Sequence, residues 1–151
     1  MRRFKDKKGV TLVELVVVMI IIAIGAAFIA PNIGAWIPNY RLRSATREIA
    51  STLRTAQMKA ISTNREYQVA FNPGGKSYIL QYRNTAGWID EGTSQALPAG
   101  ITINQITFAG NNAQFNPNST SSAGSITLGN AKSQTKNITV TPSTGRVKIG
   151  D

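Results

Sequence analysis

A long apolar run is the first prominent feature of the chain. Residues 10–30 read VTLVELVVVMIIIAIGAAFIA, and polar side chains interrupt this run only at Thr11 and Glu14. A helix of this length would measure about 31 Å, close to the roughly 30 Å hydrocarbon core of a bilayer. The pattern therefore predicts a membrane-spanning helix over residues 10–30.

A second helical pattern follows, and it is amphipathic. Over residues 31–62 small or apolar side chains recur in steps of three and four, while the basic side chains fall outside this stripe. We predict that this segment continues the first helix, buries one face against a core and stops near residues 62–64. The stripe consists of Leu42, Ala45, Ile49, Leu53, Ala56 and Ala60.

The junction between the two helical patterns contains helix-weakening residues. Pro31 and Pro38 each remove a backbone donor and crowd the preceding turn, and Gly25 and Gly34 lie nearby. We expect a kink or a locally open stretch between Gly25 and Pro38, with the two prolines as the kink residues.

From residue 63 the hydrophobic period becomes two, which is typical of strands. Alternation over residues 67–71 and 78–82 flanks the turn Asn72-Pro73-Gly74-Gly75 and predicts a hairpin. Residues 84–100 are expected to be a loop in which Asp90 and Glu91 are solvated, and residues 116–122 form another loop by composition. Further short strands are marked by Ile101, Ile103, Ile106, Phe108, Phe115, Ile126, Leu128, Ile138, Val140, Val147 and Ile149.

These elements predict an α+β fold. A long N-terminal helix packs on an antiparallel β domain that covers residues 63–151. Two tyrosines of the predicted hairpin, Tyr78 and Tyr82, are expected to be core or interface residues.

The composition points away from catalysis. The 151 residues include no cysteine, no histidine and only seven acidic residues. This excludes a thiol nucleophile, a thiolate metal site and a histidine-based triad, so we predict no catalytic residue, metal or cofactor. The formal net charge of +10 favours anionic partners such as nucleic acid or lipid head groups.

Residues 1–9, MRRFKDKKG, form a basic leader with five Lys or Arg residues and one Asp. Such a cluster before an apolar helix stays in the cytoplasm, so the rest of the chain lies outside. An ordinary signal peptide, a plain anchor and a buried core helix are simpler interpretations. Glu14 argues against an ordinary signal because an intramembrane carboxylate is costly unless it is paired.

The segment Lys8-Gly9-Val10-Thr11-Leu12-Val13-Glu14 resembles the class III signal of type IV pilins and pseudopilins. The resemblance implies that a prepilin peptidase cuts after Gly9 and methylates the new N-terminus at Val10, where the family usually has Phe. It also implies that Glu14 pairs with the terminal amine of a neighbouring subunit during assembly. Pro31 stands where the family often has a helix-bending proline.

Spacing agrees with this interpretation of Glu14. Val10 and Glu14 are four residues apart and lie on one helix face. Cleavage would create an ammonium group at Val10, and a buried carboxylate needs such a cation.

The order of one long helix and a short-stranded β domain resembles the GspH/FimT-type minor pilins and pseudopilins, which end in a Gly-Arg-Val-like segment. Here it is Thr144-Gly145-Arg146-Val147. The resemblance implies a non-enzymatic subunit of a type II secretion pseudopilus or type IV pilus-like filament, anchored in the bacterial inner membrane with its β domain in the periplasm. Its partners would be the prepilin peptidase, other pilins and the inner-membrane assembly machinery.

Two other functions remain open at this point. One is a DNA-binding minor pilin for natural transformation, in which Arg146, Lys148, Lys132 and Lys136 form a basic patch. Some FimT-type proteins carry a DNA-binding Gly-Arg-x-Arg tail, and here Lys148 replaces the second Arg. The other is a secreted soluble β-rich binding domain released by ordinary signal cleavage.

Overall fold

The computed structural model describes residues 10–150, without the side chains of residues 28–33 and 35. The predicted leader and Gly9 lie outside the described residues. The chain divides into two compact units, with the boundary between Trp36 and Ile37. Each unit is described here by itself.

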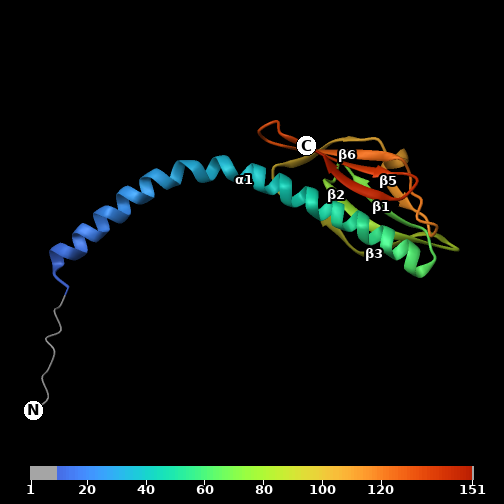
Figure 1. Ribbon diagram of the computed structural model, residues 1–151, viewed down its shortest axis with the longest axis horizontal. Helices are drawn as coiled ribbons and strands as arrows, with labels where there is room; N and C mark the ends of the chain where they lie inside the picture. Colours follow the sequence, from blue (N-terminus) through green and yellow to red (C-terminus); the bar gives the residue numbers. More distant parts are fainter. Residues whose placement is uncertain (1–9, 151) are drawn as a thin grey trace, which may run out of the picture. The chain divides into compact units, whose positions relative to one another are not determined.

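Helix α1, Leu12–Thr63, contributes to both units (Figure 1). The backbone is helical at Pro31 and Pro38, so the helix has no open stretch there, and the kink at these prolines stays a prediction. Among the described residues, no helix combines the length and the hydropathy that a membrane crossing requires. The span over residues 10–30 therefore also stays a prediction.

The end of α1 lies where the sequence indicates it. Asn64, immediately after the helix, has a φ of 52°, and the Arg65 amide donates to the Ala60 carbonyl at 3.3 Å. A left-handed residue followed by this backward hydrogen bond is the usual way in which a helix satisfies its last carbonyl groups. Asparagine adopts this conformation more readily than most residues.

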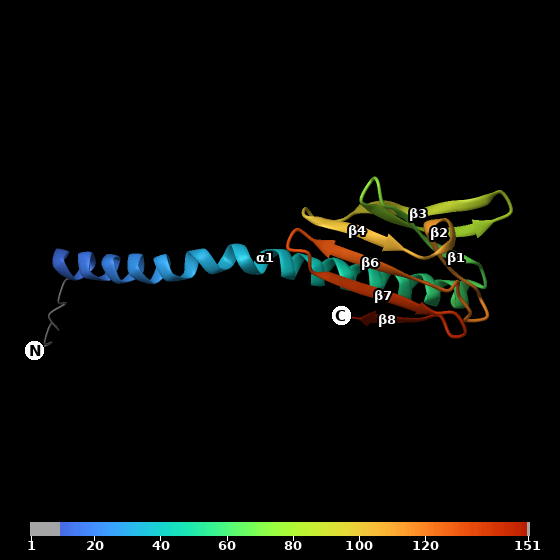
Figure 2. The same cartoon turned by 90° about the horizontal axis from the view of Figure 1, so that it is seen from above.

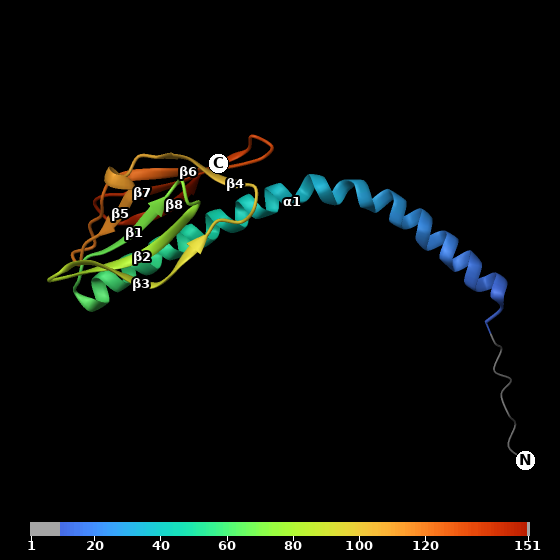
Figure 3. The same cartoon turned by 180° about the vertical axis from the view of Figure 1, so that it is seen from behind.

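The second unit contains two four-stranded antiparallel sheets (Figures 2 and 3). One sheet has the order β3-β2-β1-β5, and the other has the order β4-β6-β7-β8. The strands are β1 Tyr67–Asn72, β2 Ser77–Asn84, β3 Gly87–Ala96, β4 Ile101–Ile106, β5 Asn112–Phe115, β6 Gly124–Asn130, β7 Thr135–Thr141 and β8 Arg146–Gly150, with the short 3-10 helix η1 at Ala109–Asn111.

The predicted apolar stripe of α1 is confirmed as the centre of the core. Its six side chains are at most 3% exposed, and they pack with inward-facing residues of both sheets. The predicted hairpin is also confirmed, because β1 and β2 pair in register across the turn from Asn72 to Ser77. The largest fully buried side chains from the sheets are Phe115, Ile101, Ile126, Leu128, Ile138, Val69 and Val140.

The prediction of a loop over residues 84–100 is wrong. Residues Gly87–Ala96 form β3, which pairs with β2 as an edge strand. Most of its side chains are exposed and polar, so the strand shows none of the apolar alternation that marks a half-buried strand. Backbone pairing with β2 holds it in place, and that pairing leaves no signal in the composition.

A bulge interrupts β3 where it pairs with β2. Tyr78 pairs with Gln95 and Leu80 pairs with Glu91, so one residue of β2 opposes three residues of β3. Gly92 lies within the bulge at a φ of 87°, a conformation that favours glycine. Glu91, Thr93 and Gln95 alternate along β3 on one face, and this face forms one wall of a cleft against α1.

Candidate assembly and charged surfaces

The first turn of α1 contains the residues predicted to act in assembly. Val10 precedes the helix and is 74% exposed. Thr11 is the N-terminal cap, because its Oγ1 accepts a hydrogen bond from the Glu14 amide at 3.2 Å. The sequence Thr-x-x-Glu is the pattern of a capping box, and sequence reasoning missed it. The cap uses the backbone amide of Glu14 and leaves its carboxylate for the predicted role in assembly.

From this first turn onward, α1 exposes large apolar side chains on every face. They occur at nearly every position from Leu12 to Ile24, and Leu12 is 81% exposed while Ile22 is 60% exposed. A helix that is apolar all round is buried in a core or a bilayer, because such a surface is unfavourable in water. Exposed apolar side chains of this number are typical of a segment that packs in lipid or against other apolar helices.

The basic tail is placed by the register of β8. Arg146 pairs with Thr141 and Lys148 pairs with Thr139, and both basic side chains are exposed. Val147 between them is 6% exposed and belongs to the core. Arg146 and Lys148 thus share the outer face of the sheet with two threonine side chains, as the alternation in the sequence predicts.

The other two candidate residues do not lie on this face. Lys136 has the same parity along β7 as the buried Ile138 and Val140, and it lines a hollow against Arg43 and Arg47 of α1. Lys132 lies in the turn between β6 and β7, where its amide donates to Asn130 Oδ1 at 3.0 Å. That turn is at the opposite end of β7 from Arg146. The structure therefore divides the four predicted residues among three places.

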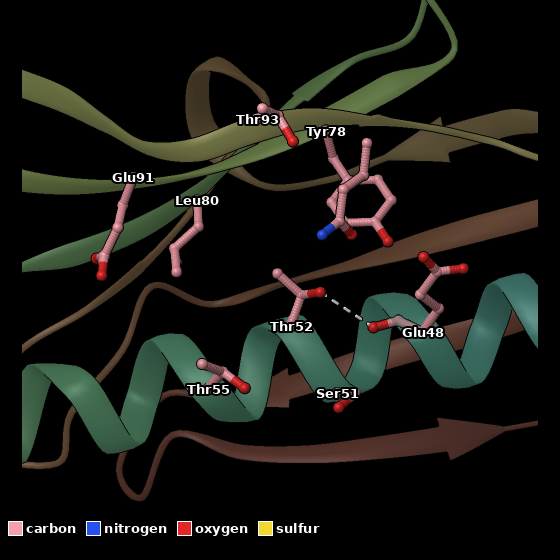
Figure 4. Close-up of a pocket in the computed structure, with 9 residues that line it drawn as sticks. Glu48, Ser51, Thr52, Thr55, Tyr78, Leu80, Glu91 and Thr93 are labelled. Carbon is pink, nitrogen blue, oxygen red and sulfur yellow. Dashed lines mark hydrogen bonds between the residues drawn. The ribbon is translucent and has the colours of Figure 1, made fainter.

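A cleft of about 310 Å³ lies between α1 and the β2–β3 pair (Figure 4). Tyr78 points into it from β2 and is 2% exposed, yet its hydroxyl has no hydrogen-bond partner of ordinary geometry. Burial raises the pKa of Tyr78 to about 12, and the nearby Glu48 carboxylate adds to this rise because it disfavours a second negative charge. The remaining lining residues are Ser51, Thr52, Thr55, Leu80, Glu91, Thr93 and Gln95.

Glu91 links the cleft to the end of the helix. Its Oε1 forms an ion pair with Lys59 Nζ, and this hydrogen bond raises the pKa of Lys59. Its Oε2 is buried and has no hydrogen-bond partner. The expectation that Glu91 is a solvated loop residue is wrong, because Glu91 lies in β3, pairs with Lys59 and has a buried Oε2. Asp90 accepts a hydrogen bond from Gln81 Nε2 at 2.7 Å.

The long helix packed on antiparallel sheets defines a pilin-like α+β protein. The chain belongs to the family described as type II transport protein GspH, whose model matches residues 45–144. The prokaryotic N-terminal methylation motif matches residues 4–30. No curated protein matches the chain.

Two solved structures of low sequence identity have a similar fold. One is the minor pseudopilin EpsH of the type 2 secretion system of Vibrio cholerae, with a TM-score of 0.64 and 9% identity over 73% of this chain and 96% of that chain. The other is the type IV minor pilin FimU of Pseudomonas aeruginosa, with a TM-score of 0.61 and 16% identity over 75% of this chain and 90% of that one.

The burial of the Tyr78 hydroxyl in the cleft can be tested through the stability of the fold. Tyr78→Phe removes a buried hydroxyl that lies near Thr52 and Glu48 but makes no hydrogen bond of ordinary geometry, so the free energy of unfolding should rise by about 1 kcal/mol. In the parent chain, the folded state holds the Tyr78 proton up to a pH of about 12, while the unfolded chain loses it near 10.0, the ordinary pKa of tyrosine. The parent chain should therefore lose stability between these two pH values. Urea unfolding at pH 7 and at several alkaline pH values measures both effects.

The variant Tyr82→Phe is the matched control. A lower stability of Tyr78→Phe at pH 7 would mean that the hydroxyl has a stabilising partner. An equal alkaline loss in the parent chain and in Tyr78→Phe would mean that Tyr78 does not titrate as described.

Proposed function

We propose that the chain is a non-enzymatic minor pilin or pseudopilin, a subunit of a type II secretion pseudopilus or a type IV pilus-like filament. One observation carries the proposal. A capped helix with large apolar side chains on all faces is continuous with a helix that anchors a GspH-family β unit. The first part has the surface of a segment that packs in lipid or among other apolar helices, and the second part is a self-contained polar-surfaced unit.

The proposed mechanism is assembly rather than catalysis. The prepilin peptidase cuts after Gly9 at the cytoplasmic face, and the new amine at Val10 is methylated. Before assembly, the subunit is anchored in the inner membrane, with residues 10–30 in the bilayer and its β unit in the periplasm. Assembly machinery then moves the apolar helix from the membrane into a bundle of other pilin helices.

Glu14 selects its neighbour in this bundle by charge. Its carboxylate lies among apolar side chains, where an unpaired charge is unfavourable. The ammonium group at the N-terminus of an adjacent subunit would neutralise it. This pairing sets the axial position of one helix against the next.

The processing step gives a direct prediction. Gly9→Val should leave the full-length precursor in the membrane, because the bulky side chain blocks the peptidase. Intact-mass measurement of the parent chain should show a mature N-terminus at Val10. Normal maturation of Gly9→Val would contradict the assignment, and a mature N-terminus after residue 30 would favour the secreted soluble domain.

The role of Glu14 can be separated from its place in the helix cap. Glu14→Ala and Glu14→Gln should both be cleaved and inserted, yet both should be lost from sheared filaments, by about tenfold or more. Glutamine serves at this position of a capping box, so Glu14→Gln changes the charge and keeps the cap.

Thr11→Ala is the complementary control, because it removes the capping hydroxyl and keeps the carboxylate. It should enter filaments. If Glu14→Gln enters filaments as the parent chain does, the carboxylate is not the assembly determinant.

DNA binding during natural transformation is a second candidate function. The observation in its favour is the outer face of β8, where Arg146 and Lys148 lie beside the hydroxyl-bearing Thr141 and Thr139. Guanidinium, ammonium and hydroxyl groups are the side-chain groups that contact phosphate oxygens. Such contacts are independent of base sequence and weaken with salt.

A charge-removal pair tests this candidate. The detergent-solubilised chain is titrated with duplex DNA at two salt concentrations, and the variant Arg146→Gln with Lys148→Gln should lose binding at an unchanged melting temperature. Lys136→Gln is the matched control, because Lys136 lies on the opposite face of the sheet, and it should retain binding. No binding by the parent chain at low salt leaves the tail with a structural role, namely charges that protect an edge strand.

A further inference from the structure

The cleft between α1 and the β2–β3 pair has acidic groups at both ends and an apolar side chain between them (Figure 4). Glu48 and Tyr78 lie close together at one end, and Glu91 lies at the other end. Leu80 lies between Tyr78 and Glu91. The strand register agrees with this order, because Leu80 follows Tyr78 by two residues on β2 and pairs with Glu91 of β3. The cleft is therefore elongated, with an acidic, apolar and acidic order along its length.

Two buried polar atoms of the cleft lack the hydrogen bonds that buried polar groups normally make. Tyr78 is 2% exposed and points into the cleft, and its hydroxyl makes no hydrogen bond of ordinary geometry. Glu91 Oε2 is also buried without a partner, although Oε1 of the same carboxylate pairs with Lys59. Because buried polar groups in proteins are nearly always satisfied, these two atoms mark positions at which a bound molecule would donate hydrogen bonds.

The charges of the lining favour a cationic molecule over a neutral one. Glu48 and Glu91 supply two negative charges, and the ion pair of Glu91 with Lys59 brings one positive charge against them. An ammonium group carries three N–H donors and no acceptor, so it can donate to a carboxylate and to a hydroxyl oxygen at the same time. Hydrogen bonds between such charged groups are roughly twice as strong as bonds between neutral groups.

We propose that the cleft is a binding site for a linear aliphatic polyamine. One ammonium group contacts the Glu48 carboxylate and the Tyr78 hydroxyl, and a second ammonium group donates to Glu91 Oε2. The methylene chain between the two groups lies along Leu80. A volume of about 310 Å³ is at the small end of the range for ligand sites, which suits a narrow, flexible chain. The site belongs to the second unit alone and does not depend on filament assembly.

Spermidine is the probe, added to the full-length chain in an uncharged detergent at constant ionic strength. A ligand that binds only the folded state stabilises it, so spermidine should raise the melting temperature, and titration calorimetry should show one site. Butylamine has a single ammonium group and can satisfy only one end of the cleft, so it should bind more weakly by about tenfold or more. Magnesium chloride controls for the effect of positive charge alone.

Three variants test the contacts at the two ends of the cleft. Glu48→Gln and Glu91→Gln each remove one carboxylate and should weaken spermidine binding by about tenfold or more. Tyr78→Phe should weaken it by about threefold or more, because it removes an acceptor oxygen and keeps the shape of the ring.

Asp90→Asn is the matched control. Asp90 is next to Glu91 on β3, but it is exposed and does not line the cleft, so this variant should bind spermidine as the parent chain does. Glu91→Gln also breaks the ion pair with Lys59. If that variant fails to fold, Glu48→Gln and Tyr78→Phe decide the outcome, since Glu48 is exposed on α1 and Tyr78→Phe should be at least as stable as the parent chain.

One-site binding of spermidine that is weakened in the cleft variants and kept in Asp90→Asn would establish the site. Absence of spermidine binding by the parent chain would overturn it. Equal stabilisation by magnesium chloride would also overturn it, because the effect would then be charge screening. Binding that survives both Glu48→Gln and Tyr78→Phe would mean that the amine binds elsewhere, and the proposed site would be wrong.

Discussion

Burial of one face of α1 against two sheets is the constraint on which the second unit depends. Each sheet is a four-stranded layer, and the helix lies across both, so the stripe from Leu42 to Ala60 is shared between them. Three of its six members are alanine, and all three are buried. Thr46 is buried beside the stripe. Its hydroxyl donates to the Leu42 carbonyl at 2.7 Å, so the buried polar group is satisfied.

The same burial determines which strands the polar residues of α1 contact. Once the apolar stripe faces the core, the residues on either side of it must meet different strands. Arg54 and Gln57 reach the β7–β8 side and donate to the carbonyls of Val147 and Thr144. Lys59 reaches the β2–β3 side and pairs with Glu91. The distribution of these side chains over two sides of α1 is thus a consequence of helical period and core packing together.

The parts of this fold that periodicity governs could be predicted from the sequence. The stripe on α1, the first hairpin and the three short C-terminal strands all alternate apolar and polar residues, because one face of each meets the core. β3 could not be predicted, since its side chains are largely polar and its stability comes from backbone pairing. The cleft was also beyond prediction, because one of its walls is β3, which carries no apolar alternation. The Thr11 cap, by contrast, is indicated by the spacing Thr-x-x-Glu.

The four basic residues near the C-terminus also could be placed only in part from the sequence. Alternation correctly places Arg146 and Lys148 outward around Val147. Strand register, which sequence does not reveal, then turns Lys136 to the helix side and leaves Lys132 in a distant turn. Basic residues that lie close together in the sequence can therefore belong to different surfaces of the fold.

The hydrogen bond from Arg54 to Val147 protects an edge of the second sheet. β8 is an edge strand, and unoccupied edge carbonyls invite a foreign strand to extend the sheet. The guanidinium group occupies one of these carbonyls from the helix side, and the bulge interrupts the regular backbone of β3 at an edge of the other sheet. Both features oppose edge-to-edge strand pairing between copies of the folded unit.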